Sequence, residues 1–289
     1  MQKPLFGPSG NSEEFYESKL TSTIQAPKWL KEQGLDAFEY SFGRGYIMSS
    51  QTAKDIGEEF RKNGIALSLH APYYINFASQ DEVLLGKTMG YIVTGIKFLR
   101  NFGADRLIFH PGSAGKMERR EAFLLTKQRI IDFANNLEEQ GLLEGIYLCP
   151  ETMGKSQQIG TYEEVLQICA GNKHLIPTFD FGHINALTQG SLKTKQDFLN
   201  ILNRSIEVIG YEKTANAHIH FSKIQYGEKG EIRHLNFDDN LYGPNFEPLA
   251  EALIELNLHP RIMSESAGHQ SQDAKEMKNI YENLLAQRK

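Results

Sequence analysis

Short apolar runs alternate along the chain with longer segments in which apolar residues recur every three or four positions. The short runs are typical of strands buried on both faces, and the longer segments are typical of amphipathic helices. The apolar runs predict eight strands, at residues 5–7, 36–40, 65–70, 106–110, 145–149, 175–179, 217–221 and 261–263. The periodic segments predict eight helices, at residues 12–33, 49–63, 81–102, 118–139, from 161 onwards, and at 193–209, 245–256 and 273–287.

Regular alternation of eight strands with eight helices predicts an α/β fold, a (β/α)8 TIM barrel formed by residues 1–289 as a single domain. No linker, low-complexity stretch or change of composition divides the sequence. The parallel strands of such a barrel run the same way, so their carboxyl ends meet at one rim, where barrel active sites lie. Residues that are far apart in the sequence therefore converge at this rim.

Most of the predicted strands end on or beside a side chain that can bind a metal ion. In chain order these side chains are His70, His110, Glu151, Asp180, His218 and Glu265, at intervals of 40, 41, 29, 38 and 47 residues. Each interval is about the length of one strand and one helix. His183, His220 and His234 follow in the same strand-end segments, so we expect them at the same rim.

Carboxylates that gather at one rim repel each other unless protons or cations neutralise them. A divalent cation supplies this neutralisation, and mixed imidazole and carboxylate ligands suit zinc, manganese or iron better than magnesium or calcium. The candidate ligands are too many for one tetrahedral ion, which predicts at least two ions. Two or three ions at a barrel mouth favour displacement at phosphorus or the isomerisation of a sugar.

The composition is typical of an ordinary globular protein, with 289 residues, of which 40% are hydrophobic and 23% are charged. A net charge of −5 argues against a surface coated with basic residues but is compatible with a local basic groove. Cys149 and Cys169 lack C-x-x-C spacing, so we expect reduced, buried thiols. The sequence has no signal-peptide pattern and no membrane-spanning run, so we expect a cytoplasmic protein without an obligate protein partner.

Several strand-end segments, taken in order from about residue 38 to 265, resemble the motifs of the endonuclease IV family. They are His70-Ala71-Pro72-Tyr73-Tyr74-Ile75-Asn76 (family pattern H-x-x-Y-x-I-N), His110-Pro111-Gly112-Ser113 (H-P-G-S), Glu151-Thr152, Asp180-Phe181-Gly182-His183 (D-x-x-H) and the final strand-end Glu265. The ordered set is much more specific than any one of its members.

The resemblance implies a barrel nuclease with three zinc ions that cleaves DNA on the 5′ side of an abasic site. The implied ligands are His70, His110 and Glu151 for one ion, Glu151, Asp180, His218 and Glu265 for a second, and His183 and His234 for the third. Glu151 would fix the pair of ions that it bridges, and Glu265 would help to orient the nucleophile. We therefore take Glu151 and Glu265 as the candidate catalytic residues.

The sequence departs from the family at the first strand, at the seventh strand and, most importantly, at the third ion. There the family has D-x-H, whereas this chain has Ile232-Arg233-His234, and an Ile cannot bind a metal. Glu231 or His220 could supply the missing ligand. We therefore expect two tightly bound zinc ions, with manganese or iron as alternatives, and a third ion that is labile or differently ligated.

The family inserts side chains from two strand-end loops into DNA, and the matching residues here are Arg44 and Tyr73, with Tyr74 beside them. Further basic residues on strand-end loops could contact phosphates: Lys116, Arg119, Arg120, Lys155, Lys223, Lys229 and Arg233. The expected partner is damaged double-stranded DNA. Two alternatives stay open, a metal-dependent sugar-phosphate isomerase or epimerase on the same barrel, and a catalytically silent protein that binds metal and nucleic acid.

Overall fold

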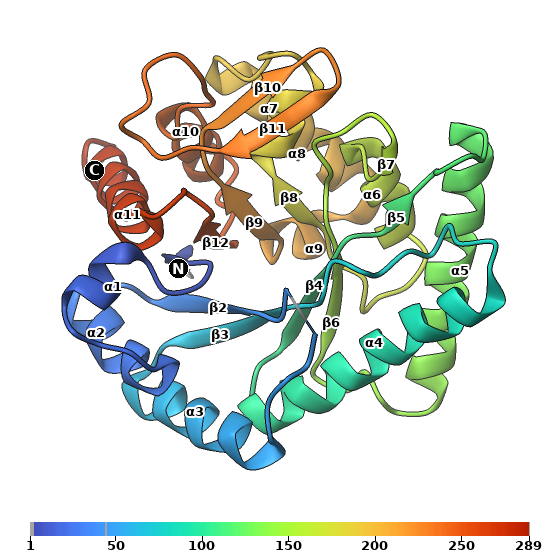
Figure 1. Ribbon diagram of the computed structural model, residues 1–289. Helices are drawn as coiled ribbons and strands as arrows, with labels where there is room; N and C mark the ends of the chain where they lie inside the picture. Colours follow the sequence, from blue (N-terminus) through green and yellow to red (C-terminus); the bar gives the residue numbers. More distant parts are fainter. Residues whose placement is uncertain (1–2, 44, 289) are drawn as a thin grey trace.

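A ring of parallel strands, surrounded by helices, forms the centre of the molecule in the computed structural model, which describes residues 3–43 and 45–288 (Figure 1). Within these ranges the ring has eight strands: β1 (Leu5–Pro8), β2 (Ala37–Ser41), β3 (Ala66–His70), β4 (Arg106–Phe109), β6 (Tyr147–Pro150), β8 (Thr178–Asp180), β9 (His218–Phe221) and β12 (Arg261–Ser264). Each predicted strand overlaps one of these, or lies beside it.

The ring consists of two four-stranded parallel sheets, ordered β1-β12-β9-β8 and β2-β3-β4-β6. Backbone contacts link the sheets at both seams. At one seam Ser9 bridges to Glu39, and Gly10 N donates to Glu39 O at 2.9 Å. At the other seam Glu151 bridges to Thr178. The predicted TIM-barrel fold class is thus confirmed, with shorter ladders at the seams than inside each sheet.

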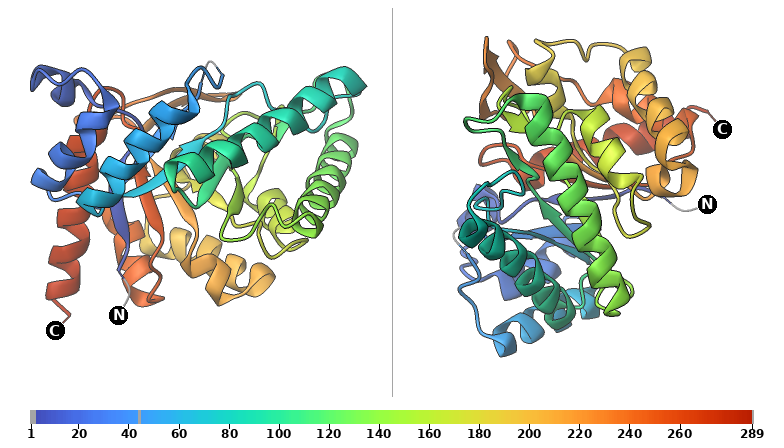
Figure 2. Two further views of the ribbon diagram at one scale, coloured as in Figure 1. Left: turned by 90° about the horizontal axis from the view of Figure 1, so that it is seen from below. Right: turned by 90° about the vertical axis from the view of Figure 1, so that its right-hand side faces the viewer.

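Helices cover the outside of the ring and connect successive strands. They are α1 (Glu13–Glu17), the 3-10 turn η1 (Thr23–Gln25), α2 (Ala26–Glu32), α3 (Ser50–Asn63), α4 (Glu82–Phe102), α5 (Arg119–Glu139), α6 (Tyr162–Cys169), α7 (Phe181–Leu187), α8 (Lys195–Ile209), α9 (Tyr211–Ala215), α10 (Glu247–Glu255) and α11 (Gln270–Ala286). Figure 2 shows α11 beside β1, so the last unit of the chain packs against the first. None of the helices in the described ranges is long and apolar enough to cross a membrane.

The prediction of one helix over residues 12–33 is wrong. Lys19 adopts a φ of 60°, which a right-handed helix cannot contain, and it follows the end of α1. Ser22 and Gln25 then form a capping box that starts η1 and α2 as a new helical segment. Local hydrogen bonding by polar side chains therefore outweighs the helical periodicity of this segment.

Four short strands lie outside the ring and shape its carboxyl rim. They are β5 (Gly112–Ser113), β7 (Gln158–Ile159), β10 (Ile224–Gly227) and β11 (Gly230–His234). The antiparallel pair β10–β11 is a hairpin within the long segment 222–244 and packs against α7 (Figure 1).

Two hydrophobic clusters hold the fold together. The larger cluster lies between the strands and the surrounding helices. The smaller consists of Ile108, Cys149 and Ile176. Side chains alternate along a strand, and Ile108 and Cys149 each precede a rim residue by two positions, so this cluster fills the inside of the ring. As expected, both cysteines are buried and free.

Candidate metal centre

The first group of candidate ligands joins the ends of three neighbouring strands. His70 ends β3, His110 follows β4, and Glu151 follows β6. Both imidazoles face one carboxylate oxygen, because Glu151 Oε2 lies 3.0 Å from His70 Nε2 and 3.3 Å from His110 Nε2. His70 Nδ1 lies 2.8 Å from the carbonyl oxygen of Ala71, which can only accept a hydrogen. Neutral His70 therefore presents the lone pair of Nε2 to the centre of the group.

A second group shares Glu151 and consists otherwise of Asp180, His220 and Glu265. His220 Nδ1 lies 3.3 Å from Glu151 Oε1 and 3.5 Å from Glu265 Oε1. Three carboxylates meet here around one imidazole. Asp180 is fully buried, and its Oδ2 atom accepts no hydrogen bond from the residues that the structure describes, although His183 Nδ1 lies 3.3 Å from it. A buried carboxylate oxygen without a donor is an atom that a cation would satisfy.

His220 takes the place in this group that the sequence resemblance gave to His218. Both side chains point into the ring, since they are two residues apart on β9. His218 lies one layer deeper and faces Glu39, with its Nε2 2.9 Å from Glu39 Oε2. The structure therefore does not bring His218 together with Glu151, Asp180 and Glu265.

A third group consists of Asp180, His183 and His234. The two imidazole rings lie edge to face, with centroids 5.3 Å apart. His183 Nδ1 lies 2.9 Å from Thr152 O, and His234 Nδ1 lies 2.8 Å from Ser222 Oγ. The carbonyl oxygen of Thr152 accepts from His183 Nδ1, so neutral His183 leaves Nε2 free for an ion.

Glu231 reaches this third group, as one of the two predicted substitutes for the missing Asp. Its Oε2 lies 3.4 Å from His183 Nε2. The cause is a bulge in the β10–β11 hairpin, because Gln225 pairs with Arg233 and the next residue of β10 pairs with Glu231. Ile232 is the extra residue, and 57% of it is exposed. The bulge reverses the side-chain alternation, so Glu231 and His234 both reach His183 although they are three positions apart.

Two glycines let the hairpin approach the ring this closely. A Cβ on Gly154 would lie 2.9 Å from the His183 ring and 2.8 Å from the Cβ of Glu231. Gly230 has a φ of 99°, and a Cβ there would collide with the carbonyl oxygen of Gly154. Glu231 N donates to the same carbonyl at 2.9 Å. The backbone of the loop after β6 thus fixes the position of Glu231.

Asp180 has a second role that sequence analysis did not assign. The helix α7, which is not among the predicted helices, begins directly after Asp180, and Asp180 is its N-cap. Asp180 Oδ1 accepts a hydrogen bond from His183 N at 2.7 Å. The spacing of D-x-x-H therefore follows from helix capping, which leaves Oδ2 turned toward the ligands and fixes the backbone of His183.

Burial and neighbouring charges shift the pKa values of the ligand side chains in opposite directions. Burial works against charge on Glu151, but His220 and His110 outweigh it and hold the Glu151 pKa well below its usual value. Burial also disfavours charge on His70, yet the hydrogen bond and charge of Glu151 raise the pKa of His70 to about 9. For His183, the charge of Asp180 outweighs burial and the pKa is raised to about 10. Burial dominates at Asp180, whose pKa is raised to about 6.

The donor set fits divalent cations that accept both nitrogen and oxygen ligands. Each group offers atoms within 4.8 Å of one another, and Glu151 and Asp180 each belong to two groups. Shared carboxylates of this kind place neighbouring ions close together. The mixture of imidazole and carboxylate favours zinc, manganese or iron.

The fold and the sequence both connect this centre to a known family. The profile of the family described as "Xylose isomerase-like TIM barrel" matches residues 27–286. The chain belongs to the xylose isomerase-like TIM barrel family. Solved structures with this barrel fold include an endonuclease IV and a D-tagatose 3-epimerase-like protein.

Among curated relatives of this family member is an uncharacterised protein of Methanocaldococcus jannaschii, 32% identical over 237 residues, which cover 82% of this chain and 84% of the relative. A probable endonuclease 4 of Staphylococcus carnosus is 30% identical over 197 residues, covering 63% of this chain and 62% of the relative. Among solved structures, endonuclease IV from Thermus thermophilus superimposes with a TM-score of 0.65 at 15% identity and covers 99% of this chain and 100% of its own. A D-tagatose 3-epimerase-like protein gives 0.67 at 21% identity, over 90% and 93%.

The side chains of the rim loops differ in their exposure to solvent and in the contacts that hold them. Arg44 lies outside the described residues. Tyr73 and Tyr74 are 56% and 50% exposed, and their rings lie 4.6 Å apart. Among the basic candidates, Arg119 is held by Glu164 through two contacts of 2.7 Å, and Lys223 donates to backbone carbonyls.

The other basic candidates on the rim are exposed: Lys116, Arg120, Lys155, Lys229 and Arg233. Of these, Arg233 donates to Gln225, and Lys155 Nζ lies 4.0 Å from Glu231 Oε2.

Proposed function

We propose that this protein is a metal-dependent phosphodiester hydrolase that cleaves DNA on the 5′ side of an abasic site. The observation that carries the proposal is the sharing of Glu151 and Asp180 between adjacent ligand groups. Sites in which carboxylates hold two or three ions close together suit in-line displacement at phosphorus. The relatives named as probable endonuclease 4 and the superposition on an endonuclease IV support the same class.

Zinc, or else manganese or iron, would be held by His70, His110 and Glu151, and by Glu151, Asp180, His220 and Glu265. Bound ions would supply Lewis acidity and neutralise charge on the oxygens of the transferring phosphoryl group. Asp180, His183 and His234 would hold a third ion, with Glu231 as a further carboxylate beside His183. This set corresponds to the differently ligated third ion expected from the sequence.

Glu265 and Glu151 would divide the catalytic work. Glu151 is buried at the bottom of the site, where both of its oxygens face histidines, so its role is to fix the ligand groups relative to each other. Glu265 is more accessible, with 19% of its side chain exposed, and it lies between His220 and His234 at 3.5 and 3.9 Å. That position suits a carboxylate that orients the attacking water and accepts its proton.

Damaged DNA would contact the same rim. The exposed rings of Tyr73 and Tyr74 offer a surface on which a base at the lesion can stack. Arg44 would contact the backbone or a groove. The free lysines and arginines of the rim would contact phosphates, which makes binding dependent on salt.

A second candidate function is a metal-dependent sugar-phosphate isomerase or epimerase. The superposition on a D-tagatose 3-epimerase-like protein favours it, because the fit is as close as that on endonuclease IV. The group of Glu151, Asp180, His220 and Glu265 could by itself hold one ion next to two hydroxyl oxygens of a sugar. The third group, Asp180, His183 and His234, would then have no evident role, which is why we place this candidate second.

The deciding experiment incubates zinc-loaded protein with a duplex that contains one abasic analogue, and with the matched undamaged duplex. We expect a nick on the 5′ side of the lesion, abolished by chelator and restored by zinc. Glu265→Gln serves as the matched variant, since it keeps the shape of the side chain and removes its charge. Fully metallated protein that leaves the abasic duplex intact but epimerises a ketose would replace the first candidate by the second.

A further inference from the structure

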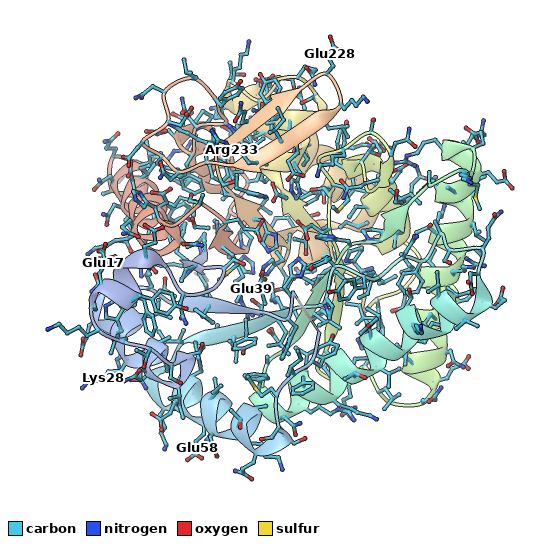
Figure 3. The ribbon with its side chains drawn as sticks, viewed as in Figure 1. Glu17, Lys28, Glu39, Glu58, Glu228 and Arg233 are labelled. Carbon is cyan, nitrogen blue, oxygen red and sulfur yellow. The ribbon has the colours of Figure 1, made fainter. Side chains whose placement is uncertain are left out.

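A buried carboxylate, Glu39 on β2, lies directly behind His220, on the side away from Glu151 and Glu265. Glu39 is fully buried. Figure 3 shows it near the centre of the ring, whereas the acidic side chains of Glu17 and Glu58 lie at the periphery. An ionised carboxylate in such a place is unfavourable unless donors surround it.

Four polar side chains surround Glu39, and three of them form hydrogen bonds with its carboxylate. His220 Nε2 lies 3.1 Å from Oε1 and 3.3 Å from Oε2. The hydroxyl of Ser9 donates to Oε1 at 3.1 Å, and that of Ser68 donates to Oε2 at 3.4 Å. His218 Nε2 lies 2.9 Å from Oε2. Among the described side chains, Glu39 forms the hydrogen bond to His220 Nε2, while the rings of His70 and His218 pack against the His220 ring.

The contact between Glu39 and His220 selects one form of the imidazole. An ionised carboxylate only accepts hydrogen bonds, so His220 Nε2 carries the hydrogen and neutral His220 keeps the lone pair on Nδ1. Nδ1 is the atom that faces Glu151 and Glu265, at 3.3 and 3.5 Å. His70 is arranged in the opposite sense, because its Nδ1 atom is bound by the Ala71 carbonyl and its Nε2 atom faces Glu151.

We propose that Glu39 is a positioning residue of the metal centre, which holds His220 with Nδ1 directed at the ion shared by Glu151, Asp180 and Glu265. A carboxylate behind a ligating imidazole fixes the orientation of the ring and increases the basicity of the ligating nitrogen. The inference rests on the metal-binding part of the proposed function and is independent of whether the substrate is DNA or a sugar.

The first test measures how many zinc ions each variant binds, and how tightly, by competition with a chromophoric chelator. Glu39→Gln keeps an oxygen that accepts from His220 but loses the charge, and Glu39→Leu loses both. We expect the affinity for one ion to fall roughly 10-fold in the first variant and roughly 100-fold in the second, the range typical for partners of ligating histidines. Ions held without His220 should keep their affinity.

Ser68→Ala is the matched control, since it removes the longest of the four contacts to the same carboxylate and leaves His220 untouched. Its zinc affinity should stay within about twofold of the wild type. Circular dichroism and thermal unfolding of the metal-free proteins check that each variant folds. Wild-type affinity in both Glu39 variants would overturn the proposal and leave Glu39 with a purely structural role.

The second test needs no variant. Long-range ¹H–¹⁵N spectra of the zinc-loaded wild-type protein report which imidazole nitrogen carries a hydrogen. We expect a hydrogen on His220 Nε2 and metal coordination at Nδ1, and the reverse pattern would overturn the proposal. A protein that binds zinc in this manner but does not nick DNA would support the role of Glu39 and contradict the proposed nuclease activity. A wild-type protein that binds no zinc would contradict both proposals.

Discussion

The two ends of the barrel both bury charge, but they balance it in different ways. At the amino end, Arg106 and Arg261 flank Asp105, with Arg261 Nη1 2.9 Å from Asp105 Oδ1 and Arg106 Nη2 3.4 Å from Oδ2. Burial opposes charge on Asp105, but the two guanidinium groups outweigh it and lower the pKa of the carboxyl. Asn216 accepts further hydrogen bonds from Arg106. Guanidinium groups keep their charge at all ordinary pH values, so the positive charge at this end is permanent.

At the carboxyl end, Glu151, Asp180 and Glu265 face histidines, whose charge comes and goes with a proton. Around these three carboxylates, the described residues therefore supply positive charge as exchangeable protons, which a metal ion can displace. The difference teaches that buried charge by itself does not mark a functional site. A functional site is indicated instead by buried carboxylates that no arginine or lysine of the fold neutralises.

Loss of the bridging carboxylate should have the largest effect. Glu151→Gln removes a ligand that two groups share, so we expect nicking of an abasic duplex to fall by roughly 1,000-fold, beyond the 10–100-fold typical of residues that only orient ligands. The measurement is single-turnover cleavage at saturating zinc. Activity within tenfold of the wild type would contradict the bridging role of Glu151. It would also contradict the view that the carboxyl end of the barrel, unlike the amino end, is the functional site.

The two histidines of β9 should give opposite results. His220→Ala should lose one bound zinc and roughly 100-fold in activity, since the imidazole is a direct ligand. His218→Ala should keep all bound zinc and lose about 2 kcal/mol of unfolding free energy, because it leaves a cavity among buried residues. Metal analysis after gel filtration, together with urea unfolding, compares the pair. Loss of zinc in His218→Ala alone would restore the assignment made from the sequence.

The amino end should respond through stability only. Arg261→Leu leaves Asp105 with one partner fewer, which for a fully buried pair costs about 3–5 kcal/mol. Because 40% of the Asp105 side chain is exposed, water takes over part of this role, and we expect about 2 kcal/mol. Urea unfolding measures the change. Bound zinc per chain should stay at the wild-type value, and a loss of zinc would show that the two ends are coupled.

Metal-free protein should lose stability as the pH rises. The pKa values of His70 and His183 are raised to about 9 and about 10 in the folded chain, against about 6.5 when unfolded. Their protons therefore stabilise the fold fully below pH 6.5, and this contribution is lost as the pH rises through 9 to 10. Bound zinc replaces the protons and should remove most of the dependence. Urea unfolding at pH 6.5 and 9.5, with chelator or with buffered zinc, checks the sign; metal-free stability that rises with pH would contradict it.

The smallest effects should come from the outer rim. Tyr73→Ala should weaken binding of an abasic duplex by about 1 kcal/mol, the lower end of the range for a ring that stacks on a base. Arg44→Ala should weaken binding more at low salt than at high salt, as expected of a phosphate contact. Both variants should bind zinc as the wild type does. Fluorescence anisotropy measures the affinities, and unchanged values in both would favour a small-molecule substrate.

Much of the centre was predictable, because residues at the carboxyl ends of parallel barrel strands all lie at one rim. His70, His110, Glu151, Asp180 and Glu265 required only the recognition of apolar runs and of the polar side chains at their carboxyl ends. Their convergence is a consequence of parallel strands, and no detail of packing can change it. The D-x-x-H spacing and the departure at Ile232 were likewise visible in the sequence.

Three features were decided only by the tertiary structure. Period-two alternation shows that His218 and His220 point to the same side, but which of them lies level with Glu151 depends on the stagger of neighbouring strands. A bulge decides that Glu231 reaches His183, and nothing in the residues 231–234 marks the extra one. Glu39 looked like an ordinary strand residue, since only closure of the ring puts β2 opposite β9 and turns its carboxylate toward His220. The sequence therefore determined which residues reach the rim, whereas the heights and registers of the strands determined which of them touch.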